Sequence, residues 1–340
     1  MLFLSSLLSI IYNAIIISMA NSLSSTKKSS NSVKYSVTVI VSAHNEENNI
    51  SHLIDLLTSQ TYPKSFYEII IVNDRSTDNT HEIIKNKTNN ILKYINIENT
   101  PIDWSPKKWA LNQAINNAKG DIIIQTDADC KMGSKWVETI VDNFNLGNIG
   151  FVCGMAPHVS SNSFINDISI IDSIAQDAFA AGCIQLNFPI TCNGRNMAFM
   201  KKAFIEVDGY NNISHILSGD DDLLLHKIAN LTNYRTVFSL NQNSVVESNS
   251  PSSIIEFIRQ RARWASKSLL YYSLDSSFEL KLLLPFLYIV NICCVITIFQ
   301  FINNPKIFLL LPWFFKTTAD LFIIKKFISH FNYKFSIINF

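Results

Sequence analysis

The chain has 340 residues, of which 48% are hydrophobic and only 16% are charged. Soluble domains average about 25% charged residues, so the deficit indicates that part of the chain lies in lipid. The net charge of +1 provides no basic field, and no nucleic-acid partner is expected. The six cysteines form no CxxC pair and have no histidines at zinc-binding spacing, so we expect them to be reduced.

Three segments are long and apolar enough to span a bilayer, namely residues 1–20, 282–302 and 307–326. The second segment carries no charge and, as a helix, is about 31 Å long, which matches a hydrocarbon core of about 30 Å. The first segment lacks a basic start and a clear cleavage site. A membrane anchor is therefore favoured over a signal peptide.

Lysines follow the first and third segments, at Lys27, Lys28, Lys34, Lys325 and Lys326. The positive-inside rule therefore predicts a multi-pass protein of the cell (inner) membrane, with the domain between the first two spans in the cytoplasm. The segment 327–340 is apolar after a basic turn and resembles the start of a further span.

One charge pair lies inside the third segment. Lys316 and Asp320 are four residues apart, so they share one helix face. Either charge alone would be costly in lipid, which favours a mutually neutralised pair at a helix–helix contact. The lining of a polar conduit is the alternative.

Residues 35–249 alternate strand and helix patterns after a Ser/Lys/Asn-rich linker at 21–34. Apolar, β-branched runs predict buried strands at 36–43, 67–74, 91–97 and 121–126. Helical patterns follow the first three runs, with Asn45 as the expected N-cap of the first helix. This alternation predicts an α/β fold with a mostly parallel, Rossmann-like sheet. Residues 188–210 are expected to form a strand, a glycine turn and a short helix.

Polar clusters accompany the predicted strands: "AHNEE", "NDRSTD" and "TDAD" follow the first, second and fourth, and "SPKK" precedes the third helix. Each cluster alone is ordinary loop or capping chemistry. Ligands of such sheets bind outside the carboxyl ends of the strands, so together the clusters predict one site with acids, a base and backbone donors. The chain has neither a GxGxxG fingerprint nor a P-loop.

Two further motifs lie downstream. Asp220, Asp221 and Asp222 directly precede an apolar helical pattern. One acid there would serve as a helix cap, but adjacent carboxylates raise one another's pKa, which suits a proton acceptor. Residues 250–275 predict an amphipathic, basic helix that lies at the membrane surface.

In their order along the chain, these motifs resemble those of the membrane-bound family 2 glycosyltransferases, which have the GT-A fold. The resemblance covers residues 36 to about 270, and the flanking spans match the family's membrane arrangement. It implies a nucleotide-diphosphate-sugar donor such as a UDP-sugar, a Mg²⁺ or Mn²⁺ ion, and inversion at the anomeric carbon.

The resemblance assigns roles to the first three motifs. Glu46 and Asp74 match the positions that hold the nucleoside base and ribose. Lys107 matches the family's donor-site lysine, although a proline replaces the glycine before it. Asp127 and Asp129 match the DxD motif, with Asp129 taking the metal and Asp127 lying near the ribose.

The last two motifs are matched in the same way. Asp220 and Asp221 match the family's ED pair, with Asp220 in place of the usual glutamate and Asp221 as the general base. Gln260, Arg263 and Trp264 match the QxxRW signature, and the resemblance places them at the donor. That signature is common in processive synthases but also occurs in relatives that make single transfers.

The resemblance therefore implies an inverting glycosyltransferase of hexosyl or N-acetylhexosaminyl type, acting in cell-envelope glycolipid or polysaccharide synthesis. Its partners would be the nucleotide sugar, a lipid-linked or saccharide acceptor, and membrane lipid. Only two spans follow the catalytic part, which favours a single transfer over a processive synthase. A non-catalytic nucleotide-binding membrane protein is the alternative from a different class.

Overall fold

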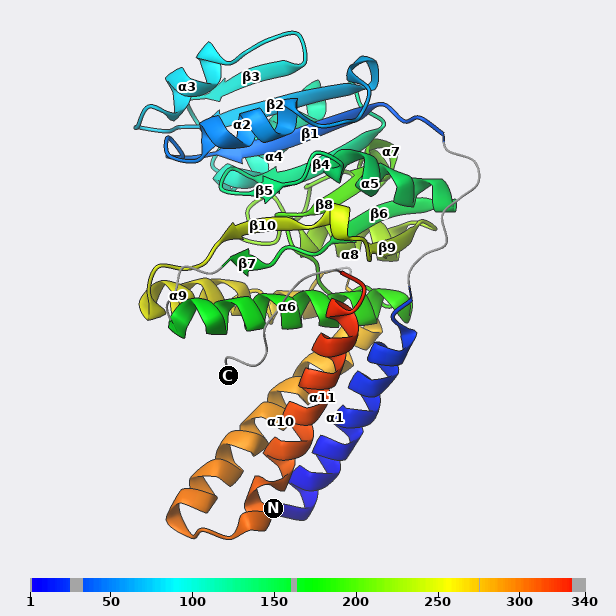
Figure 1. Ribbon diagram of the computed structural model, residues 1–340, viewed down its shortest axis with the longest axis vertical. Coiled ribbons are helices and arrows are strands. Elements are labelled where there is room, and N and C mark those ends of the chain that lie inside the picture. The colour runs from blue at the N-terminus through cyan, green and yellow to red at the C-terminus, as the bar shows by residue number, and fades with distance from the viewer. Residues whose placement is uncertain (1, 25–32, 160–163, 275, 332–340) are drawn as a thin grey trace.

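The computed structural model describes residues 2–24, 33–159, 164–274 and 276–331 (Figure 1). Most of the predicted linker, including Lys27 and Lys28, and the C-terminal segment beyond residue 331 lie outside these ranges. An α/β domain stands on a bundle of three long helices, α1, α10 and α11, in which the N-terminal helix packs beside the last one.

Seven strands form the central sheet in the order β3-β2-β1-β4-β8-β6-β9. The parallel group consists of β1 (Val37–Ala43), β2 (Tyr67–Asp74), β3 (Leu92–Ile97) and β4 (Ile122–Asp127). The remaining strands are β6 (Ile149–Gly154), β8 (Met197–Met200) and β9 (Arg235–Ser239). Only β8 runs antiparallel, to both β4 and β6, so the predicted mostly parallel α/β sheet is confirmed.

A second, three-stranded sheet has the order β5-β10-β7. Its strands are β5 (Lys131–Met132), β7 (His158–Val159) and β10 (Val246–Asn249). The helices around the two sheets are α2 (Ile50–Thr58), α3 (Thr80–Asn86), α4 (Pro106–Asn117), α5 (Trp136–Asp142), α6 (Phe164–Gln185), α7 (Lys201–Glu206), α8 (Asp222–Leu231) and α9 (Ile254–Ala265). Short 3₁₀ turns occur at Lys64–Phe66, Asn143–Leu146, Gln242–Ser244, Leu270–Tyr272 and Ile307–Leu310. α6 and α9 lie crosswise between the sheets and the helical bundle (Figure 1).

The strand order reverses between β1 and β4. The chain first adds β2 and β3 on one side of β1, and then places β4 on the other side. Right-handed crossovers therefore direct α2 and α3 to one face of the sheet and α4 to the other. The loops at the carboxyl ends of β1 and β4 diverge at this point, and ligands of open α/β sheets bind in the crevice that results.

Two local expectations are wrong. The six cysteines all lie among the described residues and are unpaired there. Asn45 is not an N-cap, because α2 begins only at Ile50, and Asn45 adopts a left-handed conformation with φ 56°. Its side chain instead accepts a hydrogen bond from the amide of Thr77, which links the loops after β1 and β2. Residues 188–193 form no strand. The strand follows the glycine turn as β8, because it pairs there with both β4 and β6.

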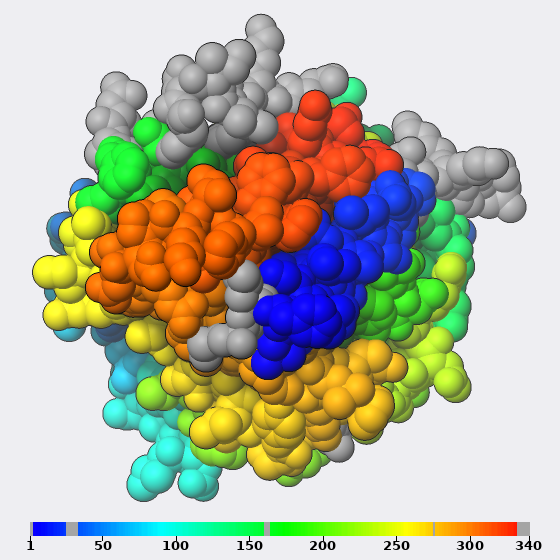
Figure 2. Space-filling view, turned by 90° about the horizontal axis from the view of Figure 1, so that it is seen from below, coloured from blue at the N-terminus to red at the C-terminus, as the bar shows by residue number. Residues whose placement is uncertain are grey.

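The three predicted spans are helical. The helices are α1 (Leu2–Ser22), α10 (Phe278–Asn303) and α11 (Leu311–Ile328), and the last is preceded by a 3₁₀ turn. The segments Phe3–Ser22, Phe278–Asn303 and Ile307–Ile328 are long and apolar enough to cross a membrane. Figure 2 shows them side by side at the end of the molecule.

A glycine fixes the bundle against the α/β domain. Gly182 of α6 faces Met19 of α1, which is fully buried. A Cβ atom added at Gly182 would lie 2.7 Å from the Met19 Cβ, nearer than side-chain atoms approach. Only glycine therefore allows α1 and α6 to pack at this distance.

The charge pair of the third span lies at a contact between helices. Lys316 Nζ is 2.6 Å from Asp320 Oδ2, and the Tyr12 hydroxyl of α1 donates a hydrogen bond to the other carboxylate oxygen. The Lys316 ammonium group also lies 5.2 Å from the centroid of the Tyr12 ring. These contacts support the neutralised pair rather than a conduit.

The first prediction tests this pair. Asp320→Leu leaves the Lys316 ammonium without its carboxylate in an apolar bundle, and we expect a loss of about 3 kcal/mol in unfolding free energy. The double variant Lys316→Met/Asp320→Leu should recover most of that loss, because it leaves no uncompensated charge. Thermal unfolding of the full chain in detergent measures both. A double variant as unstable as the single one would contradict the interpretation.

Candidate active site

The carboxyl end of β4 carries the first part of the site. Asp127 is the last residue of β4, and Asp129 follows two residues later. β1 runs in parallel beside β4, with Ser42 paired to Asp127. The loops after β1 and β4 therefore meet at one sheet edge, as the strand pattern predicts.

One lysine, Lys107, offsets part of the negative charge at this edge of the sheet. Lys107, in the first turn of α4, has its Nζ atom 2.9 Å from Asp127 Oδ1 and 3.2 Å from Asp220 Oδ2. Burial opposes the charge of this lysine, but the two carboxylates outweigh it and raise the pKa of Lys107 well above its ordinary value. Lys107 thus bridges the end of β4 and the loop before α8.

The three consecutive aspartates before α8 occupy different environments. Asp220 pairs with the lysine just described. Asp222 is the first residue of α8 and accepts hydrogen bonds from Lys267 Nζ and Tyr271 Oη, each at 2.6 Å. Asp221 lies between them, and its nearest ammonium group, that of Lys267, is 4.0 Å away.

Backbone amides fix the Asp221 carboxylate. Its Oδ1 atom accepts a hydrogen bond from the amide of Asp222 at 2.8 Å, which caps α8. Its Oδ2 atom accepts from the amide of Gly194 at 3.0 Å. The capping role expected for one aspartate therefore falls to Asp221, the residue that the resemblance assigns as the base.

These environments separate the three pKa values. Burial would raise the pKa of Asp220, but Lys107 outweighs it and lowers that pKa. In the same way Lys267 lowers the pKa of Asp222 to about 2. Burial first, and then the charge of Asp222, raises the pKa of Asp221 to about 6. The prediction that the aspartates raise one another's pKa is right for Asp221 and wrong for its neighbours, because each neighbour has its own lysine.

Asp129 is the β4 carboxylate without a direct ion pair, although the charge of Arg195 acts on it from farther away. Among the described residues none forms an ion pair with Asp129, and the Cys130 thiol contacts its Oδ1 atom at 3.7 Å. Burial and the charge of Asp127 raise the pKa of Asp129. Hard cations such as Mg²⁺ prefer carboxylate oxygens and take further ligands from water and substrate phosphates, so Asp129 fits such an ion.

The protein would not complete a metal shell by itself. Within residues 2–24, 33–159, 164–274 and 276–331, no group of three or more His, Cys, Asp or Glu side chains is arranged to hold a metal. Oxygen atoms of a bound diphosphate or of water would have to supply the remaining ligands.

Glu46 and Asp74 lie at the same sheet edge but not in the cavity wall. Glu46 Oε2 accepts a hydrogen bond from Asn49 Nδ2 at 2.8 Å. Burial, and less strongly the charge of Asp129, raises the pKa of Glu46 against the effect of that bond. Asp74 ends β2, is 4% exposed, and pairs with Arg75 Nε at 2.8 Å.

The helix α9 carries the predicted residues Gln260, Arg263 and Trp264, and all three line the cavity. The Arg261 guanidinium lies 4.3 Å from the Trp264 ring centroid and pairs with Asp172 of α6, which ties α9 to α6. The Gln260 Oε1 atom is buried without a hydrogen-bond partner, and the Arg263 side chain has no ion pair or hydrogen bond with any described residue. α9 therefore turns toward the cavity a cation, Arg263, that has no partner among the described residues.

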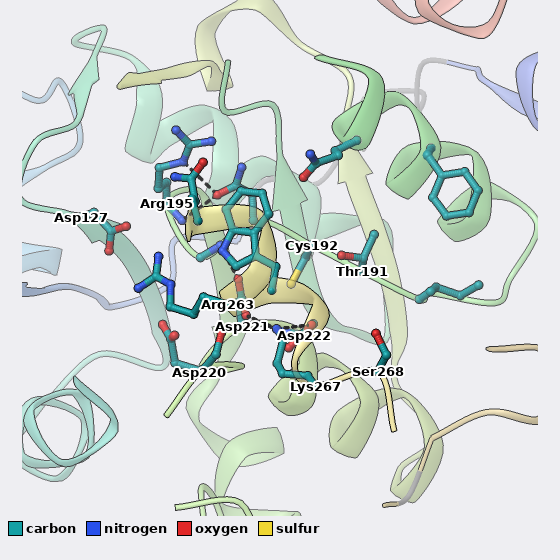
Figure 3. Close-up of a pocket in the computed structure, with 18 of the residues that line it drawn as sticks. Asp127, Thr191, Cys192, Arg195, Asp220, Asp221, Asp222, Arg263, Lys267 and Ser268 are labelled. Carbon is teal, nitrogen blue, oxygen red and sulfur yellow. Dashed lines mark hydrogen bonds and ion pairs between the residues drawn. The ribbon is translucent and has the colours of Figure 1, made fainter. Parts of the chain in front are cut away.

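These groups surround a cavity of about 490 Å³. The predicted site residues that line it are Lys107, Asp127, Asp129, Asp220, Asp221, Gln260, Arg263 and Trp264. In Figure 3, Asp127, Arg195 and Asp220 lie on one side of the cavity, and Thr191 and Ser268 lie on the opposite side. Asp221, Asp222 and Lys267 lie between the two sides.

The sequence reasoning missed some of the residues that line the cavity. Arg195 holds the glycine turn, because its Nη2 donates to the carbonyl of Ala156 at 2.8 Å and its Nε to Asn193 Oδ1 at 3.0 Å. Lys267 and Tyr271 were missed because both lie beyond Ala265, the end of α9. Their contacts with Asp222 join segments far apart in the chain, which no local pattern signals.

The second prediction concerns the lysine bridge. Lys107→Met leaves the carboxylates of Asp127 and Asp220 facing each other, and their repulsion raises the pKa of Asp220 in the folded state. The free energy of unfolding of the variant should be about 1 kcal/mol lower at pH 7.5. This value is modest because the Lys107 side chain is partly exposed. Below the raised pKa the loss should shrink, because Asp220 then takes up a proton.

Thermal unfolding at pH 7.5 and pH 4.5 measures the effect. Lys135→Met, which removes an exposed lysine just before α5, is the matched control and should change neither midpoint. An equal loss for Lys107→Met at the two pH values would contradict the electrostatic explanation.

Known proteins share both fold and sequence with this chain. The solved structure of the mannosyltransferase PcManGT from Pyrobaculum calidifontis, in complex with GDP-Man and Mn²⁺, has a TM-score of 0.56. The match covers 97% of this chain and 99% of the mannosyltransferase chain. The sequence identity is 15%, so the similarity is one of fold alone.

Sequence relatives include the glycosyltransferase AglE of Haloferax volcanii, 28% identical over 192 residues. A poly-β-1,6-N-acetyl-D-glucosamine synthase of Staphylococcus aureus is 27% identical over 236 residues. These matches cover 54% and 67% of this chain, and the chain spans only 58% and 53% of the relatives. The model of the family "Glycosyl transferase family 2" matches residues 38–207. The chain belongs to glycosyl transferase family 2.

Proposed function

We propose that the chain is a membrane-bound inverting glycosyltransferase. It moves a hexosyl or N-acetylhexosaminyl group from a nucleotide-diphosphate sugar, with UDP-sugars as the first candidates, to a lipid-linked or saccharide acceptor. The observation that carries the proposal is that the β4 carboxylates, the aspartates before α8 and Arg263 of α9 line one cavity. The family membership and the names of the two sequence relatives support this reaction class, and the name of the synthase supports a role in polysaccharide synthesis.

The donor binds at the end of the cavity formed by β4 and α9. Glu46 and Asp74 hold the base and ribose at the sheet edge, and Asp127 lies near the ribose. Arg263 pairs with the diphosphate, a role supported by the lack of a partner for its side chain among the described residues. Trp264 offers an aromatic face to the sugar, and Gln260 lines the cavity beside the donor.

Asp129 is the proposed metal ligand, with Mg²⁺ or Mn²⁺ as the ion. Such an ion, when bound, offsets the negative charge of the diphosphate and of the leaving group. The proposal is supported by the lack of an ion pair at Asp129 among the described residues and by the Mn²⁺ in the complex of the structural relative.

Asp221 is the proposed general base. An acceptor hydroxyl has a pKa far above 7 and must lose its proton as it attacks the anomeric carbon. The raised pKa of about 6 makes Asp221 the most basic of the three adjacent aspartates. The amides of Gly194 and Asp222 fix its orientation, and Asp220 holds Lys107 beside the donor.

The membrane arrangement is part of the proposal. The three apolar helices would cross the cell membrane, with the α/β domain on the cytoplasmic side and α9 at the headgroups. Lys34, Lys325 and Lys326 support this orientation through the positive-inside rule.

The third prediction tests the site. Asp221→Asn removes the proton acceptor, and we expect sugar transfer to fall at least about 100-fold while nucleotide binding is retained. Asp129→Ala should abolish both transfer and the Mn²⁺-dependent part of nucleotide binding. The matched control is Asp103→Asn, at an exposed position before α4. The assay follows release of the nucleoside diphosphate from UDP-sugars and GDP-mannose. Full transfer by Asp221→Asn would overturn the base assignment.

The fourth prediction concerns pH. Asp221 must be deprotonated to act as a base, so kcat/KM should fall as the pH drops through about 6. Lys267 lowers the pKa of Asp221, so Lys267→Met should move this acidic limb to higher pH. A pH–rate profile of both proteins measures the shift, and circular dichroism at each pH checks folding. An acidic limb that stays in place in Lys267→Met would show that the titrating group is elsewhere.

A further inference from the structure

The cavity has a second end that the proposed donor does not need. The residues that line it include Leu280, Leu283, Leu284 and Leu287, all from the first turns of α10. Phe179 of α6 also lines the cavity. We call this end, lined by the four leucines, the leucine arm.

The four leucines form one face of the helix. They are spaced i, i+3, i+4 and i+7, which places them in a single stripe about 10 Å long. Leu282 and Ile289 lie on the opposite face and are 57% and 49% exposed. The helix therefore turns one apolar face to the cavity and another outwards, and only the outward face is explained by contact with membrane lipid.

Hydrogen bonds hold this part of α10 against the site. Ser268, which lines the cavity, has its hydroxyl oxygen 3.1 Å from that of Tyr288. Pro285 lacks an amide hydrogen and leaves the carbonyl of Lys281 without its helical donor. The Tyr272 hydroxyl donates to that carbonyl at 3.1 Å. The arm is thus a built part of the fold.

The position of Asp221 connects the two ends. Figure 3 shows Asp221 between the side with Asp127 and Arg195 and the side with Thr191 and Ser268. A hydroxyl group that reaches Asp221 from the leucine side would face a sugar held on the donor side. The acceptor then enters the cavity from α10.

The chemistry of the arm selects the kind of acceptor. Leucine side chains offer no hydrogen bonds to sugar hydroxyls, so a polysaccharide threaded along them would lose its hydration without compensation. An aliphatic chain gains by burial there. The arm also begins on a helix that continues as an apolar segment long enough to span a membrane.

We propose that the acceptor is a membrane lipid whose hydroxyl-bearing head group lies at Asp221 and whose aliphatic chain lies in the leucine arm. This inference rests on the proposed function and names the acceptor class of the same site. It assigns acceptor selection to α10, outside the residues 38–207 that match the family model.

The experiment uses the full-length protein in phosphatidylcholine nanodiscs. The probe is dodecyl β-D-glucoside that carries a photoreactive diazirine in its dodecyl group. After illumination, mass spectrometry should locate label on Leu280, Leu283, Leu284 or Leu287. Dodecyl β-D-glucoside should compete at least about tenfold better than butyl β-D-glucoside, because each buried methylene favours binding. Leu284→Trp and Leu287→Trp fill the arm and should each reduce labelling at least about fivefold. Leu282→Trp adds the same ring on the outward face and should leave labelling unchanged.

Label confined to the Leu282 and Ile289 face would overturn the inference, as would equal effects of Leu282→Trp and Leu284→Trp. Equal competition by the two glucosides would do the same and would favour a saccharide acceptor. Release of nucleoside diphosphate from UDP-glucose, UDP-N-acetylglucosamine and GDP-mannose with Mn²⁺ is measured in the same nanodiscs. Absence of this release would contradict the proposed function. Release together with labelling that does not depend on the alkyl-chain length of the competing glucoside would contradict only the acceptor assignment.

Discussion

The site depends on the pairing of clustered carboxylates with two lysines that come from different parts of the chain. Lys107, at the start of α4, bridges the end of β4 and the loop before α8. Lys267, beyond α9, pairs with Asp222 from the other side. Buried carboxylates at these distances repel one another strongly unless cations lie between them. The α/β domain and the helix at its base are therefore joined by charge as well as by apolar packing.

This pairing gives adjacent aspartates different chemistry. The two outer members of the series are kept ionised by their lysines, and the middle one is left with a raised pKa. Asp129 receives no lysine, which leaves it as the carboxylate suited to a divalent cation. Three adjacent aspartates thus give one candidate base, Asp221, between two ionised carboxylates, because their neighbouring groups differ.

The helices at the base of the domain form part of the cavity wall. α6 and α9 lie between the sheets and the bundle (Figure 1), and both contribute residues to the wall, as does α10. The ion pair between Arg261 and Asp172 and the close packing at Gly182 connect these helices to one another and to α1. The cavity is therefore shaped jointly by the sheet edge, by α6 and α9, and by the first turns of the candidate span α10.

The sequence by itself determined the parallel strands, the polar sheet edge and the three apolar helices. These features follow from local periodicity and from the rule that parallel strands end at one edge, so residues such as Asp127 and Asp129 were located correctly. Only the tertiary structure decided that Lys107 and Lys267 divide the aspartates between them, that Glu46 and Asp74 lie beside the cavity, and that four leucines of α10 line it. Each of these contacts joins segments far apart in the chain, and no local pattern encodes which distant side chains will meet. The left-handed Asn45 and the position of β8 were mispredicted for the same reason, because partners in other loops and strands fixed them.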